Sequence, residues 1–187
     1  MIPGRQEPAP AVQLSRLVQA KAQALFASGR MLCAPAVLTA LNRGLGGGLD
    51  QAALHNLAAG LVNGLGGAGC LCGAVGGGCL ALGLFLGNGK PDGRAARRVA
   101  AAGRELHHAF RAARGSTCCR VLTQKVKHDR KAHRAQCAEL SGLAAGLACR
   151  IIIARRPGLA PRADLAYLRR GEPPKSGLAR LAAAVAP

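Results

Sequence analysis

Four cysteines stand where a thiol can do chemistry: Cys33, Cys72, Cys119 and Cys137. The first three lie at the expected starts of helices, where backbone N–H groups and the helix dipole stabilise negative charge. Such an environment lowers the pKa of a thiol and makes its sulfur a nucleophile or a metal ligand. The fourth lies on the apolar stripe of an expected helix over 129–154 and is expected to face the core. These residue types indicate thiol redox chemistry or metal binding.

Glycines cluster around the second of these cysteines. Because residues 51–89 contain no Asp, Glu, Lys or Arg, the segment CLCGAVGGGCLALGLFLG predicts a buried helix over about 72–86. Each glycine inside a helix costs roughly 1 kcal/mol relative to alanine, so a close neighbour must justify it. We expect Gly73 and Gly76 to clear room for a sulfur atom, a cluster or a neighbouring backbone.

The composition predicts that helices position these residues. Half of the chain is hydrophobic, yet only 2% is aromatic and there is no tryptophan. Alanine and leucine favour helices, whereas strands favour β-branched and aromatic residues. We therefore predict an all-α fold, a compact multi-helix bundle around a Gly-rich buried central helix. Further helices are expected over 11–28, 33–43, 50–62, 93–114 and 161–170, and one capped by Ser116 is expected to hold Cys118 and Cys119 in its first turn.

The charge is unevenly distributed along the chain. The net charge is +18, and residues 1–89 contain five basic and two acidic residues, against twenty-one and six in residues 90–187. A basic half attracts nucleic acid, an anionic membrane surface or an acidic partner, although a GC-rich coding bias toward arginine explains the same composition. We expect a flexible lead over 1–10, a cysteine domain over 11–156 and a basic, Ala/Pro-rich extension over 157–187.

The N-terminus lacks the continuous apolar segment of a secretory signal, so a cytoplasmic location is expected. In a reducing compartment the eight cysteines favour metal or redox use over a framework of structural disulfides.

Four segments resemble, in order, the family of redox-active proteins named for its pattern C_GCAxxG_C_C. They are ALFASGRMLCAPAVLTAL, LCGAVGGGCLALGL, FRAARGSTCCRVL and CAELSGLAAGLA, within about residues 20–153. The resemblance implies that the family's cysteines fall on Cys33, Cys72, Cys119 and Cys137, and the glycines of its CGAxxG box on Gly73 and Gly76. It also implies a small, mostly helical protein with a redox role, but it defines neither a reaction nor a substrate.

Both the residues and the resemblance lead to the hypothesis that the four thiols converge between helices. Two chemistries then stay open. Four thiolates can hold an iron–sulfur cluster or a zinc ion. Alternatively, two pairs such as Cys33 with Cys72 and Cys119 with Cys137 can cycle between dithiol and disulfide. The cysteines are scattered singly rather than in CxxC pairs, so an ordinary zinc ribbon is disfavoured.

The remaining cysteines and the histidines have weaker patterns. Cys70 and Cys118 are spare thiols that can resolve a mixed disulfide, whereas packing is the simpler explanation for Cys70, Cys79 and Cys149. Cys149 lies off the core-facing stripe. His133 lies one turn before Cys137, a spacing that allows shared metal binding, but its basic neighbours favour a solvated ring. The other histidines considered, with a ligand role disfavoured, are His55, His107 and His108.

Other classes of function have less support. Residues 70–87 are uncharged and of marginal length for a membrane span of roughly 20 residues, so a small membrane-associated protein stays an alternative. The stripe of Arg97, Arg104 and Arg111 lacks interleaved aromatic residues, so only nonspecific attraction to nucleic acid is expected. No hydrolase or transferase motif is present. The prediction is electron transfer or thiol–disulfide exchange with an unidentified, acidic redox partner protein.

Overall fold

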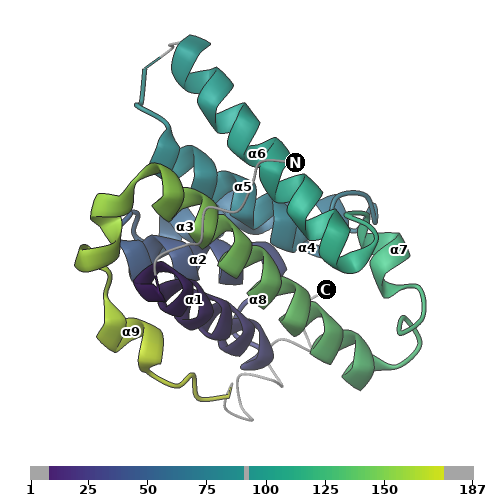
Figure 1. The fold of residues 1–187 in the computed structure, drawn as a ribbon. Coiled ribbons are helices and arrows are strands. Elements are labelled where there is room, and N and C mark those ends of the chain that lie inside the picture. Colours follow the sequence, from purple (N-terminus) through teal and green to yellow (C-terminus); the bar gives the residue numbers. More distant parts are fainter. Residues whose placement is uncertain (1–8, 91–92, 175–187) are drawn as a thin grey trace.

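The computed structural model describes residues 9–90 and 93–174, and within them the regular secondary structure is helical (Figure 1). This confirms the predicted all-α fold. Nine α-helices occur in the described part of the chain: α1 (Ala9–Ala27), α2 (Cys33–Leu45), α3 (Gln51–Ala58), α4 (Val62–Leu65), α5 (Gly73–Leu86), α6 (Gly93–Arg114), α7 (Cys119–Thr123), α8 (Arg130–Arg155) and α9 (Leu165–Arg169). Two 3₁₀ segments, Ala59–Leu61 and Pro157–Arg162, complete the set.

Helices α8 and α5 form the centre of the bundle. Helix α8 packs against α1, α2, α5 and α6, and α5 packs between α2, α6 and α8. The Gly-rich α5 buries most of its residues, as the sequence predicted. Helix α1 approaches α8 closely because Gly142 and Gly146 carry no side chain there: a Cβ at Gly142 would lie 3.0 Å from the backbone oxygen of Gln19.

The segment between α3 and α5 differs from the expected single helix over 50–62. Helix α3 begins after Asp50, whose side chain accepts from the N–H of Ala53 at 2.8 Å, but it ends at Ala58. The short α4 contains left-handed backbone at Asn63 (φ 54°) and Gly64 (φ 74°). Left-handed conformations end regular helix, so this part of the chain folds into a compact loop instead.

The expected helix start near Ser116 is also corrected. Helix α7 begins at Cys119, with Cys118 at the N-cap position and extended in backbone conformation. The Ser116 hydroxyl accepts from the N–H of Cys118 at 3.0 Å, so it orders the loop before the helix rather than capping the helix itself.

The described part of the predicted C-terminal extension packs on the bundle. Helix α9 lies against α1 and α2, and its Tyr167 and Leu168 belong to the hydrophobic core. Lys21 of α1 is 1% exposed, forms an ion pair with Glu172 and donates to the backbone oxygen of Arg170 at 2.9 Å. The predicted lead over 1–10 and the end of the extension lie largely outside the described residues.

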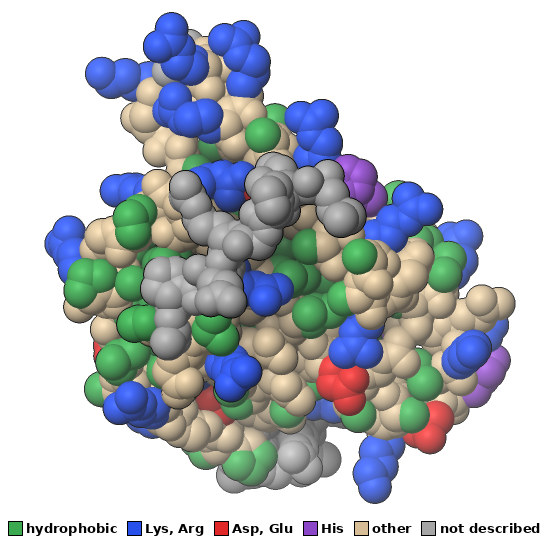
Figure 2. All heavy atoms as spheres, in the orientation of Figure 1, with side chains coloured by type: hydrophobic (Ala, Val, Ile, Leu, Met, Phe, Trp, Pro, Cys, Tyr) green, Lys and Arg blue, Asp and Glu red, His purple; other side chains and the backbone are tan. Residues whose placement is uncertain are grey.

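Basic side chains gather at the end of α6 that projects from the bundle (Figure 2). The first turns of α6 contribute little to the core, since Ala95 is the one buried residue of this helix before Ala102. Arg94, Arg97 and Arg98 are exposed there. The predicted positive stripe on this helix therefore faces solvent.

One helix in the described residues, α8, is long and apolar enough to cross a membrane by length and composition. Of its most apolar window 72% is buried inside the bundle, which is typical of the core helix of a soluble protein. Helix α5, from the segment considered as a span, has 14 residues and is shorter than the roughly 20 that a bilayer requires.

Candidate functional site

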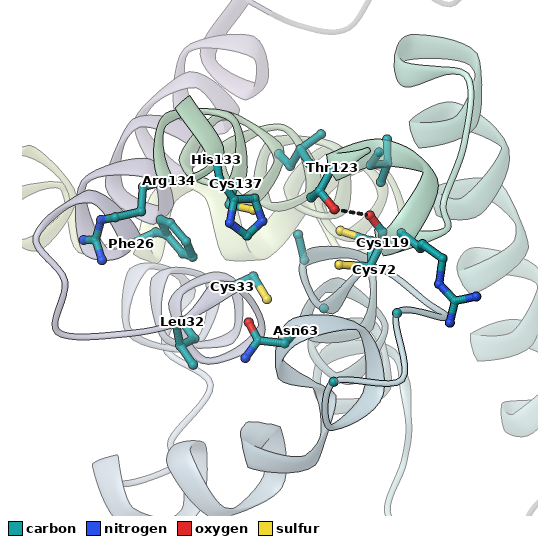
Figure 3. A pocket seen from close by; sticks show the side chains of 17 residues that line it. Phe26, Leu32, Cys33, Asn63, Cys72, Cys119, Thr123, His133, Arg134 and Cys137 are labelled. Carbon is teal, nitrogen blue, oxygen red and sulfur yellow. Dashed lines mark hydrogen bonds between the residues drawn. The ribbon is translucent and has the colours of Figure 1, made fainter. Parts of the chain in front are cut away.

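All four predicted cysteines line one cavity of about 420 Å³ (Figure 3). Cys33 comes from the start of α2, Cys72 from the residue before α5, Cys119 from the start of α7 and Cys137 from the third turn of α8. The sequence hypothesis required these distant segments to meet, and the structure brings them to one place.

A short backbone pairing holds Cys72 beside Cys119. The N–H of Cys72 donates to the oxygen of Thr117 at 2.7 Å, and the N–H of Cys119 donates to the oxygen of Cys70, also at 2.7 Å. Leu71 and Cys118 form an isolated antiparallel bridge between these bonds. These backbone hydrogen bonds hold the starts of α5 and α7 together. The sulfur atoms of Cys72 and Cys119 lie side by side in Figure 3.

Glycines of α5 admit Cys33 and the neighbouring backbone. A Cβ at Gly73 would collide with the Cys33 sulfur and would lie 2.5 Å from the carbonyl oxygen of Leu61. The expectation that Gly73 clears room for a sulfur is therefore confirmed. Gly64, at positive φ, leaves the same kind of room for the Cβ of Cys119.

The assignment of Gly76 to the last position of the CGAxxG box needs correction. Counting from Cys72 places that glycine at Gly77. A Cβ at Gly77 would lie 2.5 Å from the backbone oxygen of Ala34, whereas the nearest atoms to one at Gly76 belong to the side chain of Leu61, the closest at 3.1 Å. Gly77 therefore sets the close approach of α5 to α2.

The predicted lowering of the thiol pKa values is wrong, because burial outweighs the helix starts. Burial raises the pKa of Cys72 to about 12, although the backbone N–H groups of Ala74 and Val75 at the start of α5 act in the opposite direction. Burial also raises the pKa of Cys33 and of Cys119, and that of Cys137 to about 12. Removing a thiolate from water disfavours its charge more than these backbone groups favour it.

The four thiols also act on one another. The charge of Cys33 raises the pKa of each of the other three thiols. Cys119 raises the pKa of Cys72 and Cys137, and Cys72 raises that of Cys137. Charges interact more strongly the closer they are, so this coupling agrees with the shared lining of the cavity.

Burial raises the pKa of Cys33, whereas the backbone N–H groups of Asn63, Ala34 and Cys33 itself favour its thiolate. Asn63 lines the cavity from its left-handed position in α4. Sequence reasoning missed this residue, and the NG dipeptide of the loop NGLGGAG was the signal for its backbone conformation.

The rim of the cavity is partly basic and partly apolar. Arg120, His133 and Arg134 line it together with Phe26 and other apolar side chains. His133, expected to be solvated, is half-buried and lies near Cys137 in Figure 3. His133 lies one turn before Cys137 on the same face of α8, as the spacing in the sequence indicated.

The other cysteines and histidines lie apart from the cavity lining. Cys70 is exposed, and Cys118 donates its thiol to the oxygen of Gly69 at 3.2 Å. Cys79 is half-buried, and Cys149, predicted to lie off the core stripe, is fully buried in α8. His107 forms a hydrogen bond with the hydroxyl of Thr117 at 3.0 Å, and His55 with Gln51 at 3.3 Å, while His108 is exposed.

The described side chains do not form a ready metal site. No group of three or more His, Cys, Asp or Glu side chains in residues 9–90 and 93–174 is placed to hold one metal ion. The four thiols share a cavity, but a metal centre would require their side chains to move.

Comparison with known proteins agrees with the geometry of the cysteines. Residues 31–151 match the family described as "Putative redox-active protein (C_GCAxxG_C_C)". Neither the curated proteins nor the solved structures give a match. The matched segment covers well over half of the chain and contains all four cysteines of the cavity, so the protein belongs to the C_GCAxxG_C_C family of redox-active proteins.

Proposed function

We propose that the protein performs thiol–disulfide exchange in the cavity, with Cys33 as the attacking thiol and Cys72 as its resolving partner. The observation that carries this proposal is that four cysteines from distant segments of the chain line the same cavity. A cavity of about 420 Å³ beside them falls in the usual size range of small-molecule sites.

The exchange has two steps. Cys33 loses its proton to solvent, and its thiolate attacks one sulfur of a substrate disulfide, so that a mixed disulfide forms and one half of the substrate leaves as a thiolate. Cys72 then loses its proton and attacks the Cys33 sulfur, which releases the second half. Both released thiolates take up protons. The substrate gains two electrons and two protons, and the protein gains a Cys33–Cys72 disulfide.

The surroundings of Cys33 support its role as the attacking group. Burial raises the pKa of both thiols, to about 12 for Cys72, and the Asn63 N–H favours the thiolate of Cys33. The sulfur of Cys33 lies against Gly73, next to Cys72 in the chain, so the resolving thiol is its neighbour. Cys119 and Cys137 supply a second pair by the same chemistry.

The test is a reaction of the reduced protein with bis(2-hydroxyethyl) disulfide, followed by mapping of disulfides by mass spectrometry. We expect a Cys33–Cys72 disulfide in the wild type, and a trapped mixed disulfide on Cys33 in Cys72→Ala. Cys33→Ala is expected to slow the reaction by at least tenfold. The matched control is Cys79→Ala, a half-buried thiol outside the cavity, which should react as the wild type does.

Two outcomes would contradict the proposal. One is a Cys33→Ala variant that folds, by circular dichroism, and reacts at the wild-type rate. The other is oxidation confined to Cys70 and Cys118, the thiols outside the cavity lining. Metal analysis of anaerobically purified protein separates the alternative chemistry, because stoichiometric iron or zinc bound to the four thiols would replace exchange by a metal centre.

We also propose that the physiological partner is an acidic protein that docks on α6. The exposed arginines on the projecting end of this helix support that charge preference (Figure 2). Association between oppositely charged surfaces slows as salt rises. A rate of reduction by the partner that does not change between low and high salt would refute this choice of surface.

A further inference from the structure

A second cavity, of about 320 Å³, lies on the other side of the loop between α1 and α2. Three arginines from separate segments line it: Arg30 in that loop, Arg43 near the end of α2, and Arg170 after α9. None of the three forms an ion pair with a carboxylate among the described residues. Convergence of three unpaired guanidinium groups concentrates positive charge in one place.

Among the described residues, the one carboxylate that lines this cavity is already neutralised. Glu172 pairs with Lys21, which is 1% exposed. The Lys21 ammonium group also lies 4.3 Å from the centre of the Tyr167 ring, and the guanidinium carbon of Arg43 lies 4.7 Å from it. The surroundings of the cavity therefore keep a positive excess around Tyr167.

Two buried hydroxyl groups belong to the lining residues and lack a partner. The hydroxyl oxygens of Thr39 and Tyr167 have no hydrogen-bond partner in the described part of the chain, and the residues are 1% and 5% exposed. Buried hydroxyl groups in folded proteins almost always have a partner. Both residues line the cavity, so a ligand with acceptor oxygens that enters it supplies what the fold does not.

We propose that this second cavity binds the phosphate group of a small phosphate monoester. Arginine guanidinium groups match the oxygens of phosphate in paired hydrogen bonds, and the hydroxyls of Thr39 and Tyr167 are further donors. The volume exceeds what a bare ion needs and falls in the range of small-molecule sites. This site is distinct from the thiol cavity, although Arg30 and Met31 line one and Leu32 and Cys33 line the other.

The chain carries its own reporter for the test. Tyr167 is its only tyrosine and there is no tryptophan, so fluorescence excited near 280 nm comes from this cavity alone. The full chain is titrated with glycerol 3-phosphate at constant ionic strength. We expect a saturable change, with the dissociation constant raised at least tenfold in Arg43→Ala and in Arg170→Ala. The control, Arg104→Ala on exposed α6, is expected to bind as the wild type does.

Affinity is taken from the midpoint of the titration, because removal of Arg43 alters the fluorescence itself. Thr39→Val keeps the shape of the side chain and is expected to weaken binding several-fold without changing the thermal midpoint by more than a few degrees. A linear, unsaturated response of the wild type would overturn the site. Equal affinity of the two arginine variants and the wild type would also overturn it, as would equal binding of acetate and the phosphate ester.

Discussion

Replacement of Gly73 by alanine tests whether the Cys33 sulfur lies where the site requires. The added Cβ would collide with that sulfur and lie 2.5 Å from the carbonyl oxygen of Leu61, against an ordinary contact of at least 3.4 Å. The backbone oxygen would therefore have to move by about 0.9 Å. The Cys33 side chain would have to leave its present rotamer or its helix would have to shift.

The size of the effect follows from two opposed contributions. Overpacking of a filled site costs about 1 to 3 kcal/mol. Alanine favours the helical state by up to about 1 kcal/mol over glycine in a helix interior, and less at Gly73 because it is the first residue of α5. We expect Gly73→Ala to lower the free energy of unfolding by about 1 to 2 kcal/mol.

Gly83 is the matched control, because it lies in the same helix and a Cβ there meets nothing within 4 Å. Gly83→Ala should raise the free energy of unfolding by about 0.5 to 1 kcal/mol. Urea unfolding of the reduced proteins measures both changes, and alkylation followed by mass spectrometry measures the reactivity of Cys33. If Gly73→Ala were as stable as Gly83→Ala with unchanged alkylation of Cys33, the packing of this sulfur on α5 would be wrong.

Three further predictions concern stability. Folding raises the pKa of Cys72 from 9.0 to about 12. The neutral thiol therefore contributes its full stabilisation of the folded state below pH 9, and this contribution is lost as the pH rises toward 12. The difference in urea stability between wild type and Cys72→Ala should narrow by about 1.4 kcal/mol from pH 7 to pH 10, and a constant difference would contradict the burial of this thiol. Glu172→Gln should lower the free energy of unfolding by about 1 to 3 kcal/mol, because the buried Lys21 loses its ionic partner. The control Glu139→Gln, at an exposed ion pair, should lower it by less than about 1 kcal/mol. Thermal unfolding measures both changes. Asn63→Ala should lower the free energy of unfolding by about 1 kcal/mol, because alanine is disfavoured in the left-handed backbone conformation of this position. Asn63→Gly should restore the stability.

Local sequence signals were sufficient for most of the fold. Helix α6 occupies the predicted range because Gly93 and Gly115 bound an uninterrupted apolar and basic periodicity. The start of α8 follows from Asp129, whose carboxylate accepts from two N–H groups of the first turn. Spacing along α8 also placed Cys137 toward the interior. Helix limits and helix faces depend largely on neighbours in the chain, so the sequence indicated those of α6 and α8, whereas it misplaced the end of α3 and the start of α7.

Contacts between distant segments were beyond such signals. The bond from the Cys119 N–H to the Cys70 oxygen joins residues that no periodicity relates. The direction of the thiol pKa shifts depends on how much of each sulfur is withdrawn from water by other helices, and a helix start alone gave the wrong sign. Glycine counts indicated a close approach to α5, but the identity of the approaching atoms, a cysteine sulfur at Gly73 and a backbone oxygen at Gly77, required the tertiary structure.

The raised pKa values bear directly on what kind of redox protein this site can be. A thiol reacts as its thiolate, so a thiol with a raised pKa reacts slowly with oxidants that meet it from solvent. Burial is the main cause of the raised pKa of Cys72, and the charges of the Cys33 and Cys119 thiolates add to it. In the proposed exchange Cys33 becomes part of a neutral mixed disulfide, so its charge no longer opposes ionisation of Cys72. The first step of the proposed exchange therefore removes one of the two thiolate charges that oppose ionisation of the resolving thiol.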